Sequence, residues 1–233
     1  MAYIEFHNVS KKYKLGEVYL EALKNVSFEI ERGEICTIVG PSGAGKTTVL
    51  NILGGMDTCD AGNVVVDDRV VTAQNRREQT MYRRRDVGFV FQFYNLVQNL
   101  TAFENIELVA KMSENPLDSM KMLELVGLEE RAGNFPAQLS GGEQQRISIA
   151  RALVKKPKVL LCDEPTGALD YETGIQILKL LQDAGRAIGM TVVIITHNQA
   201  ITPMANRVIT MRSGKIHRIE INETPVPVER IEW

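Results

Sequence analysis

Residues 40–47 read Gly40-Pro41-Ser42-Gly43-Ala44-Gly45-Lys46-Thr47, a glycine-rich loop between an apolar run and a segment of helical character. This motif in this context predicts a phosphate-binding loop, whose glycines let backbone N–H groups curl around phosphate oxygens. The start of the following helix adds partial positive charge. We expect Lys46 to hold the β- and γ-phosphates, Thr47 to bind magnesium and Thr48 to belong to the same site. An ordinary glycine turn is disfavoured because motif and context agree.

Three apolar runs rich in β-branched residues predict strands that are covered on both faces, as in a parallel sheet between layers of helices. They are residues 35–39, 159–162 and 192–195. Polar residues follow each run: the loop at Gly40, then Asp163 and Glu164, then Thr196 and His197. Ligands of doubly wound sheets bind beyond the carboxyl ends of the strands. The three strand endings are therefore expected to meet at one site.

Asp163 and Glu164 are expected to have different roles at that site. A carboxylate at the end of a buried strand is costly unless it meets a cation, which a magnesium ion bound to Thr47 would supply. Glu164 can reach a water aligned on the γ-phosphate, and we assign it the role of general base. On their own these features describe a P-loop NTPase, a class that includes kinases, GTPases, helicases and transport motors.

A second helix start narrows the class. Residues 139–146 read Leu139-Ser140-Gly141-Gly142-Glu143-Gln144-Gln145-Arg146 and precede a helical pattern of apolar residues. Ser140 is the predicted N-cap, and the two glycines expose the first free amides. The chain thus has a second helix N-terminus suited to binding an anion. A small-molecule kinase does not explain this motif.

These motifs, in this order, resemble those of the nucleotide-binding subunits of ATP-binding cassette (ABC) proteins, and the resemblance covers nearly the whole chain. Tyr13 lies where the family stacks an aromatic ring on adenine, and Gln92 matches the family's Q-loop. Residues 140–144 match the signature, Ala168-Leu169-Asp170 the D-loop and His197 the switch histidine. Plainer explanations remain open for single residues: Tyr13 as a strand-edge aromatic, Gln92 as a polar surface residue and His197 as a structural histidine.

The resemblance implies an α/β fold, a P-loop NTPase of the ABC type. It has a mostly parallel sheet flanked by helices, an N-terminal antiparallel β subdomain and a small helical subdomain at about residues 93–155, within a single nucleotide-binding domain that spans residues 1–233. Alternation of apolar and polar residues at 4–9 and 26–30 independently predicts the antiparallel strands.

The resemblance implies three groups of site residues. The catalytic residues are Glu164, His197 and Gln92, and the metal ligands are Thr47, Gln92 and Asp163. The nucleotide contacts come from Tyr13, Gly40, Pro41, Ser42, Gly43, Ala44, Gly45, Lys46, Thr47, Thr48, Ser140, Gly141, Gly142, Gln144 and Asp170.

The resemblance also implies the ligands and partners. ATP and Mg²⁺ bind at the site, and two copies of the chain form a head-to-tail dimer in which the signature helix of one caps the γ-phosphate held by the other. Residues 91–96, 100–102, 104–105 and 165–167 are similar to the branch of lipoprotein-release, macrolide-export, cell-division and peptide-antibiotic-resistance ATPases. The expected partner is an integral membrane permease, contacted through Phe93, Tyr94 and Leu96. This places the chain peripherally at the cytoplasmic face of the plasma membrane.

Composition weighs against nucleic acid as a partner. The net charge is −2, from 27 basic and 29 acidic residues, whereas duplex binders carry a basic face. A soluble ABC-type ATPase of DNA repair or translation is the alternative, but the chain has no sustained heptads, no paired C-x-x-C and only one cassette.

Three separated cysteines favour core packing in a reducing compartment. No segment approaches the roughly 18 apolar residues of a spanning helix. The arginines at 83–85 are expected to form a solvated surface, with lipid headgroups or an acidic partner as the alternative.

Overall fold

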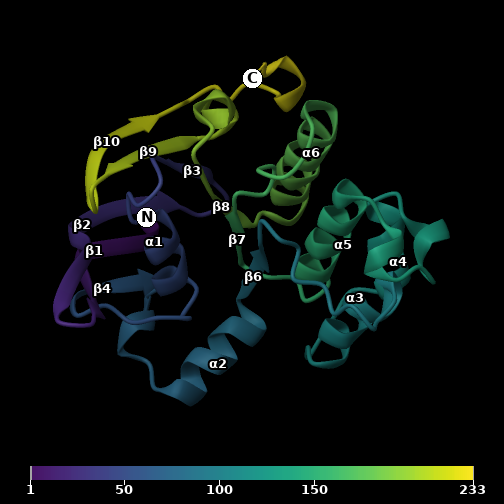
Figure 1. Ribbon diagram of the computed structural model, residues 1–233, viewed down its shortest axis with the longest axis horizontal. Helices are drawn as coiled ribbons and strands as arrows, with labels where there is room; N and C mark the ends of the chain where they lie inside the picture. Colours follow the sequence, from purple (N-terminus) through teal and green to yellow (C-terminus); the bar gives the residue numbers. More distant parts are fainter. Residues whose placement is uncertain (1, 233) are drawn as a thin grey trace.

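Two β-sheets organise the chain (Figure 1). The computed structural model describes residues 2–232. The four-stranded sheet has the order β2-β1-β4-β5 and only antiparallel pairs. Its strands are β1 (Ala2–Leu15), β2 (Val18–Glu31), β4 (Ala61–Val66) and β5 (Arg69–Val70). This confirms the predicted N-terminal antiparallel sheet. Its first two strands are longer than predicted because shifts in register let pairing continue past the breaks in alternation.

The six-stranded sheet has the order β10-β9-β3-β8-β7-β6. All its pairs are parallel except that of β10 with β9. The three apolar runs identified in the sequence form adjacent strands in the middle of this sheet, which confirms the mostly parallel sheet. The strands are β3 (Ile35–Val39), β6 (Val87–Val90), β7 (Val159–Asp163), β8 (Thr191–Thr196), β9 (Arg207–Arg212) and β10 (Lys215–Ile221).

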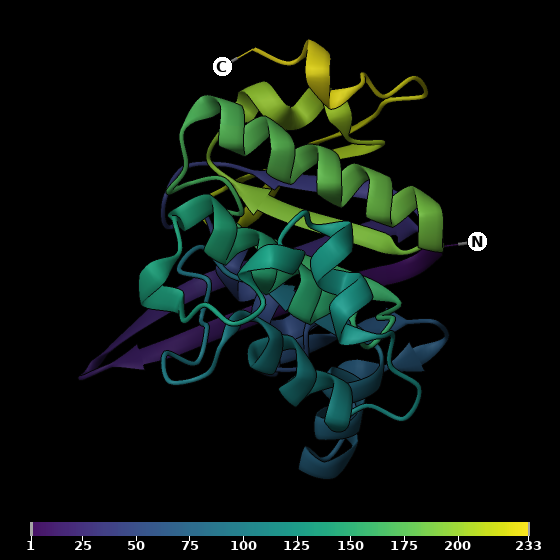
Figure 2. The ribbon, with the colours of Figure 1, turned by 90° about the vertical axis from the view of Figure 1, so that its right-hand side faces the viewer.

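Helices flank this sheet. They are α1 (Lys46–Leu53), α2 (Arg76–Arg85), α3 (Ala102–Lys111), α4 (Ser119–Leu125), α5 (Gly141–Leu153) and α6 (Tyr171–Ile188). Short 3-10 turns lie at residues 71–73, 129–131, 136–138, 199–204 and 228–230. The helices α3, α4 and α5 pack on one another as a helical lobe, which is teal and lies in front in Figure 2. Within residues 2–232, no helix combines the length and apolar character that a membrane crossing requires.

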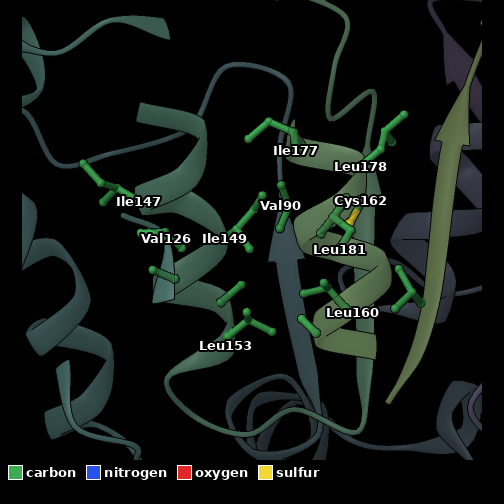
Figure 3. Packing of buried hydrophobic residues seen from close by; sticks show 14 of the residues in the cluster. Val90, Val126, Ile147, Ile149, Leu153, Leu160, Cys162, Ile177, Leu178 and Leu181 are labelled. Carbon is green, nitrogen blue, oxygen red and sulfur yellow. The ribbon is translucent and has the colours of Figure 1, made fainter. Parts of the chain in front are cut away.

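Two hydrophobic clusters cover the two faces of the parallel sheet. On one face, Leu160 and Cys162 of β7 pack with residues of α5 and α6 (Figure 3). On the other face, Val159 and Leu161 of the same strand join a cluster with α1 and the antiparallel sheet. Alternate residues of one strand therefore enter opposite cores, as the period of a strand requires. Consequently α1 and α5 lie on opposite faces of the sheet.

The arginines at 83–85 end α2; Arg84 and Arg85 are exposed, as expected, and Arg83 is partly buried, and all three also bind acceptors of this chain. Arg83 donates to the carbonyl oxygen of Gly55 at 2.5 Å. Arg84 donates to the carbonyl oxygen of Met112, and Arg85 pairs with Glu114. The run ties α2 to the segment after α1 and to the segment that follows α3. Basic side chains in the last turn also complement the negative end of the helix dipole.

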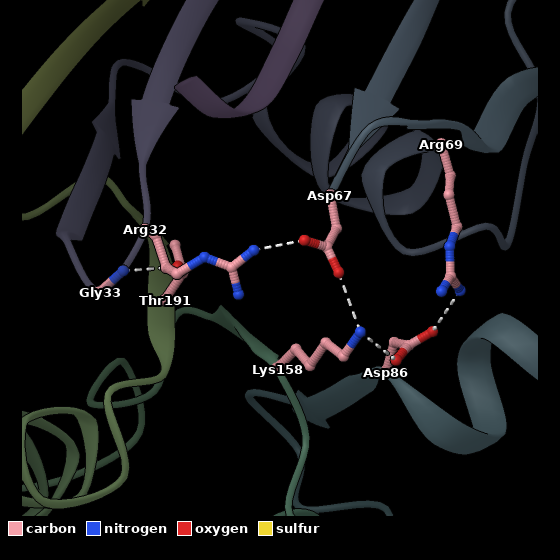
Figure 4. Close-up of polar contacts among 7 residues, drawn as sticks. All are labelled: Arg32, Gly33, Asp67, Arg69, Asp86, Lys158 and Thr191. Atoms are coloured by element: carbon pink, nitrogen blue, oxygen red, sulfur yellow. Dashed lines mark hydrogen bonds and ion pairs between the residues drawn. The ribbon is translucent and has the colours of Figure 1, made fainter. Parts of the chain in front are cut away.

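An ion-pair network joins the two sheets at the amino ends of the parallel strands (Figure 4). Asp67, in the turn between β4 and β5, lies 2.9 Å from the ammonium nitrogen of Lys158 and also pairs with Arg32. Lys158 lies 3.5 Å from Asp86, which also pairs with Arg69 at 3.7 Å. The hydrogen bond from Lys158, followed by that from Arg32, lowers the pKa of Asp67 despite some desolvation. The network fixes the antiparallel sheet relative to β6 and β7.

We expect Asp67→Asn to lower the free energy of unfolding by about 0.5–1 kcal/mol at neutral pH, the scale of partly exposed ion pairs. The folded-state pKa of Asp67 lies below its unfolded value of about 3.9. Its ion pairs therefore stabilise the fold above that pH, and the contribution is lost as the pH falls through the folded pKa. Urea unfolding at pH 7 and pH 3 measures this, and the two chains should converge in acid.

Asp68→Asn is the matched control because Asp68 is exposed in the same turn. Both aspartates have positive φ, 51° and 61°, which asparagine tolerates. An equal loss of stability in both variants would contradict the role of the network.

Candidate active site

The loop from Gly40 to Thr47 curls between β3 and α1 as the motif predicts. Gly45 precedes α1 with a φ of 100°, and a Cβ there would lie 2.6 Å from the carbonyl oxygen of Ala22. Only glycine allows this approach of the loop to the antiparallel sheet. The buried Lys46 ammonium donates to the carbonyl oxygens of Gly40 at 2.8 Å and Pro41 at 3.1 Å. The lysine is thereby held within its own loop.

A cavity of about 400 Å³ opens beside this loop. Residues 42–48 line it together with Tyr13, Gln92, Asp163 and Glu164. The cavity thus brings together residues predicted from the first two strand ends and from the Q-loop, although they lie far apart in the sequence. A volume of a few hundred cubic ångströms is typical of small-molecule sites. The nearby residues Leu20, Glu21 and Ala22 complete the lining.

The donor set of this cavity fits magnesium. Thr47, Gln92 and Asp163 offer hydroxyl, amide and carboxylate oxygens, the hard ligands that Mg²⁺ prefers. Asp163 is half-buried at the end of β7. Its pKa is raised by burial and then by the charge of Glu164, and Lys46 offsets this only in part. A divalent cation would remove the cost of the buried carboxylate. Its ligation by these residues stays a prediction.

Glu164 points into a second polar cluster. Its backbone φ is 46°, which is unfavourable for a residue other than glycine. One carboxylate oxygen accepts a hydrogen bond from Thr196 Oγ1 at 2.8 Å, and the other lies 2.9 Å from His197 Nδ1. Glu164 lines both the first cavity and a second one of about 610 Å³ that contains His197. His197 is therefore connected to the first cavity through Glu164.

The signature residues lie away from these cavities. Ser140 caps α5 and forms a capping box with Glu143, with bonds of 3.2 and 2.8 Å. A Cβ on Gly142 would lie 2.3 Å from Thr173, so the glycine permits close packing of α5 on α6. Asp170 caps α6 by accepting from the Thr173 backbone at 3.0 Å. The residues described as lining the two cavities do not include Ser140, Gly141, Gly142, Gln144 or Asp170.

The segment after Gln92 departs from the expected exposed surface. The Phe93 side chain is 76% exposed, but Tyr94 is partly buried and Leu96 lies in the core at 7%. Leu96 is therefore wrong as a contact for a membrane partner. Arg151 of α5, which the sequence did not single out, donates to the carbonyl oxygens of Tyr94 at 2.8 Å and Asn95 at 2.6 Å. This tie fixes the segment to the helical lobe.

Sequence reasoning placed Thr196 at the converging strand ends without a role, and it missed Asp57. Thr196 Oγ1 donates to Glu164, but a threonine that ends a strand carries no motif that would predict this contact. Asp57 accepts from the Tyr13 hydroxyl at 2.7 Å and lies outside every motif. Contacts between residues so distant in sequence leave no local pattern.

The sequence profile of the ABC transporter family matches residues 23–167. The chain is an ABC transporter ATP-binding protein. The uncharacterised ABC transporter ATP-binding protein MJ0796 of Methanocaldococcus jannaschii is 43% identical over 226 residues, 93% of this chain and 96% of the relative. A solved structure of MJ0796, a dimeric post-hydrolysis state bound to ADP and Pi, superposes with a TM-score of 0.87 at 40% identity, covering 94% of this chain and 98% of that one.

Two other relatives differ in their transport systems. The methionine import ATP-binding protein MetN 2 of Bacillus cereus is 40% identical over 219 residues, 91% of this chain and 64% of the relative. The solved structure of cbiO1 from Clostridium perfringens, part of the ABC transporter complex cbiONQ, has a TM-score of 0.81 at 27% identity, with coverage of 94% and 88%. This ABC ATPase thus hydrolyses ATP to ADP and phosphate, coupled to transport.

We expect Thr196→Val to lower kcat for ATP roughly tenfold or more, because Glu164, the predicted general base, loses one of the two contacts that orient its carboxylate. Binding of ATP should change little, because Thr196 is absent from the described lining of the first cavity. Steady-state ATPase kinetics and nucleotide titration measure the two effects.

Thr202→Val is the matched control, since the Thr202 hydroxyl donates to the carbonyl oxygen of Gln199 at 2.8 Å in the turn after β8. If Thr196→Val hydrolysed ATP at the wild-type rate, the hydrogen bond from Thr196 to Glu164 would not be required for turnover.

Proposed function

We propose that this ABC ATPase is the motor subunit of a membrane transporter, and that two copies close head to tail around ATP. The observation that carries the dimer is the placement of α1 and α5 on opposite faces of the parallel sheet. Within one chain the start of α5 is thereby separated from the phosphate loop before α1. A second chain can present its own Ser140 to that loop. The solved structure of MJ0796 is dimeric, which supports a dimer of this chain.

Electrostatics favour such closure only while a γ-phosphate is present. Lys46 and the N-terminus of α1 attract the phosphates from one side, and the N-terminus of the partner's α5 would do so from the other. The capping box stabilises the start of α5 in the single subunit, and the partial positive charge of that helix end would attract an anion. Loss of the γ-phosphate removes the charge that both sides share, and the two subunits part.

We assign hydrolysis to Glu164. Its carboxylate accepts a proton from the attacking water, while Thr196 and His197 keep it in place. Thr47, Gln92 and Asp163 would hold Mg²⁺, which supplies positive charge against the phosphate oxygens. Tyr13 lines the same cavity and would contact the base. Asp170 and residues 140–144 belong to the surface that meets the second copy.

A membrane permease is the proposed partner of the helical lobe. Phe93 is highly exposed, Leu108 on α3 is 43% exposed, and Met112, the C-cap residue of α3, is 48% exposed. Leu108 and Met112 are four residues apart and so lie on one face of the helix. Exposed apolar side chains of this kind suit a protein interface. The chain would thereby sit at the cytoplasmic face of the plasma membrane through its partner.

We further propose that the transporter belongs to the branch of lipoprotein-release, macrolide-export, cell-division and peptide-antibiotic-resistance ATPases. The support is local sequence, at residues 91–96, 100–102, 104–105 and 165–167. The similarity to MetN 2, named for methionine import, means that overall likeness does not assign the direction of transport. The nucleotide-binding domain is proposed to span residues 1–233, with residues 93–155 as its helical part.

We expect Glu164→Gln to reduce ATP turnover by roughly 10²–10⁴-fold, the usual contribution of a positioned base, while ATP still binds. Because the γ-phosphate then persists, the closed dimer should accumulate with ATP but not with ADP. Size-exclusion chromatography with light scattering measures the dimer, and a phosphate-release assay measures turnover. Hydrolysis at the wild-type rate would refute the assignment of the base.

We expect Ser140→Arg in the Glu164→Gln background to abolish the ATP-dependent dimer, because a bulky cation replaces the capping hydroxyl at the proposed interface. Binding of ATP to the single subunit should remain. Thr101→Arg is the matched control, since Thr101 forms the same capping box at the start of α3. Loss of either cap costs about 1 kcal/mol. A dimer that forms equally well with Ser140→Arg would count against head-to-tail closure.

A further inference from the structure

The hydroxyl of Tyr13, in β1, contacts residues near both ends of α1, the helix that follows the phosphate loop. It donates to Asp57 Oδ2 at 2.7 Å, and the Thr48 side chain also hydrogen bonds to it. Thr48 lies in the first turn of α1. Asp57 lies beyond the end of α1, where the chain folds back so that the Asp57 N–H donates to the carbonyl oxygen of Asn51 at 3.2 Å. Tyr13 is therefore held by the same structural unit that carries the phosphate loop.

Lys11 completes this cluster. Its ammonium group donates to Asp57 Oδ1 at 2.8 Å and to the carbonyl oxygen of Thr58 at 2.6 Å. The side chain is only 10% exposed. The same nitrogen lies over the Tyr13 ring, 5.2 Å from its centroid, where the ring's negative face attracts a cation. The Asp57 carboxylate thus holds the Tyr13 ring in two ways. It accepts the hydrogen bond from the Tyr13 hydroxyl, and it keeps the Lys11 cation over the ring.

The protonation states of Tyr13 and Asp57 fix the phenol as the donor and the carboxylate as the acceptor of their hydrogen bond. Burial on its own would raise the pKa of Asp57, but hydrogen bonds from Lys11 and Tyr13 outweigh it and lower that pKa. Burial and the bond to Asp57 raise the pKa of Tyr13. At neutral pH the carboxylate is therefore charged and the phenol is protonated. A charge-assisted hydrogen bond of this type is stronger than one between neutral groups.

We propose that Asp57 is a positioning residue for base recognition: it fixes the Tyr13 ring at the wall of the nucleotide cavity, so that the ring is already oriented when a base stacks on it. The inference rests on the proposed function, in which Tyr13 contacts the base. Tyr13 lines the cavity, and Asp57 is not among the described residues that line it. Asp57 therefore acts through the ring and not on the nucleotide.

Loss of the positioning by Asp57 should weaken binding of the base and not binding of the phosphates. A ring that must first be ordered costs conformational entropy on binding, which corresponds to about a fivefold loss of affinity for one side chain. A ligand without a base does not bear this cost. Pyrophosphate and ADP share the diphosphate group, and ADP is neither hydrolysed nor expected to hold the dimer. The pair of ligands therefore separates base recognition from phosphate binding.

The test compares Asp57→Ala with the wild type by calorimetric titration of ADP and of pyrophosphate at equal Mg²⁺. We expect the Kd for ADP to rise about fivefold and the Kd for pyrophosphate to stay unchanged. In ATP hydrolysis, KM should rise while kcat is preserved. Tyr13→Phe, which keeps the ring and removes the hydroxyl, should weaken ADP binding. Asp57→Ala should weaken it less in the Tyr13→Phe background than in the wild type, because only the contact through Lys11 is left to lose.

Asp60→Ala is the matched control. Asp60 lies in the same loop and accepts from the Lys12 backbone at 2.6 Å, and no hydrogen bond or ion pair joins it to Tyr13 among the described residues. Its binding of ADP should equal that of the wild type. Equal weakening of ADP and pyrophosphate by Asp57→Ala would overturn the proposal, because Asp57 would then shape the phosphate loop. Effects of Asp57→Ala and Tyr13→Phe that multiply in the double variant would also overturn it.

The wild type separates this inference from the function on which it rests. A wild-type chain that binds ADP no more tightly than pyrophosphate would overturn the base site itself. A wild type with a clear preference for ADP, together with an Asp57→Ala variant that retains it in full, would overturn only the role of Asp57.

Discussion

The parallel pairing of β3, β8 and β7 is the constraint on which the nucleotide site depends. Its register sets Val39 beside Thr196 and Ile195 beside Asp163, so the chain leaves all three strands at one edge of the sheet. Backbone hydrogen bonds maintain this register, while the buried side chains of the strands only have to be apolar and suited to two covered faces. The polar residues just beyond the strand ends are therefore free to serve chemistry, and the sheet supports them rigidly.

Two consecutive carboxylates at this edge occupy different surroundings. Asp163 ends β7 beside the phosphate loop, where burial and its neighbour's charge favour a cationic ligand. Glu164 turns away through its positive φ and meets Thr196 and His197. A single peptide unit with an unusual backbone conformation thus separates a metal-binding type of carboxylate from one suited to proton transfer. Unfavourable backbone geometry is often retained at functional sites for such a reason.

Alternating apolar and polar residues, continuous apolar runs and local motifs predicted the two sheets, the phosphate loop and the family. Features that depend on distant contacts were missed. Helix α2 escaped prediction because only Tyr82 among its residues is buried, which leaves no apolar periodicity. Leu96 was expected at the surface, but it is buried in the hydrophobic cluster on one face of the parallel sheet, and nothing near position 96 indicates this. Asp57 meets Lys11 and Tyr13 across more than 40 residues. The dimer contacts assigned to the signature stay predictions because they require a second chain.

The alternation of β7 between two cores limits how this strand can diverge. Substitution is easy, since any apolar residue of fitting volume serves at Leu160 or Leu161. Insertion or deletion is not: a change of one residue in length would exchange the faces of the whole strand and turn Asp163 away from the phosphate loop. Homologous chains should therefore vary the identity of residues here freely while they preserve the number of residues, and gaps should be confined to the surface connections.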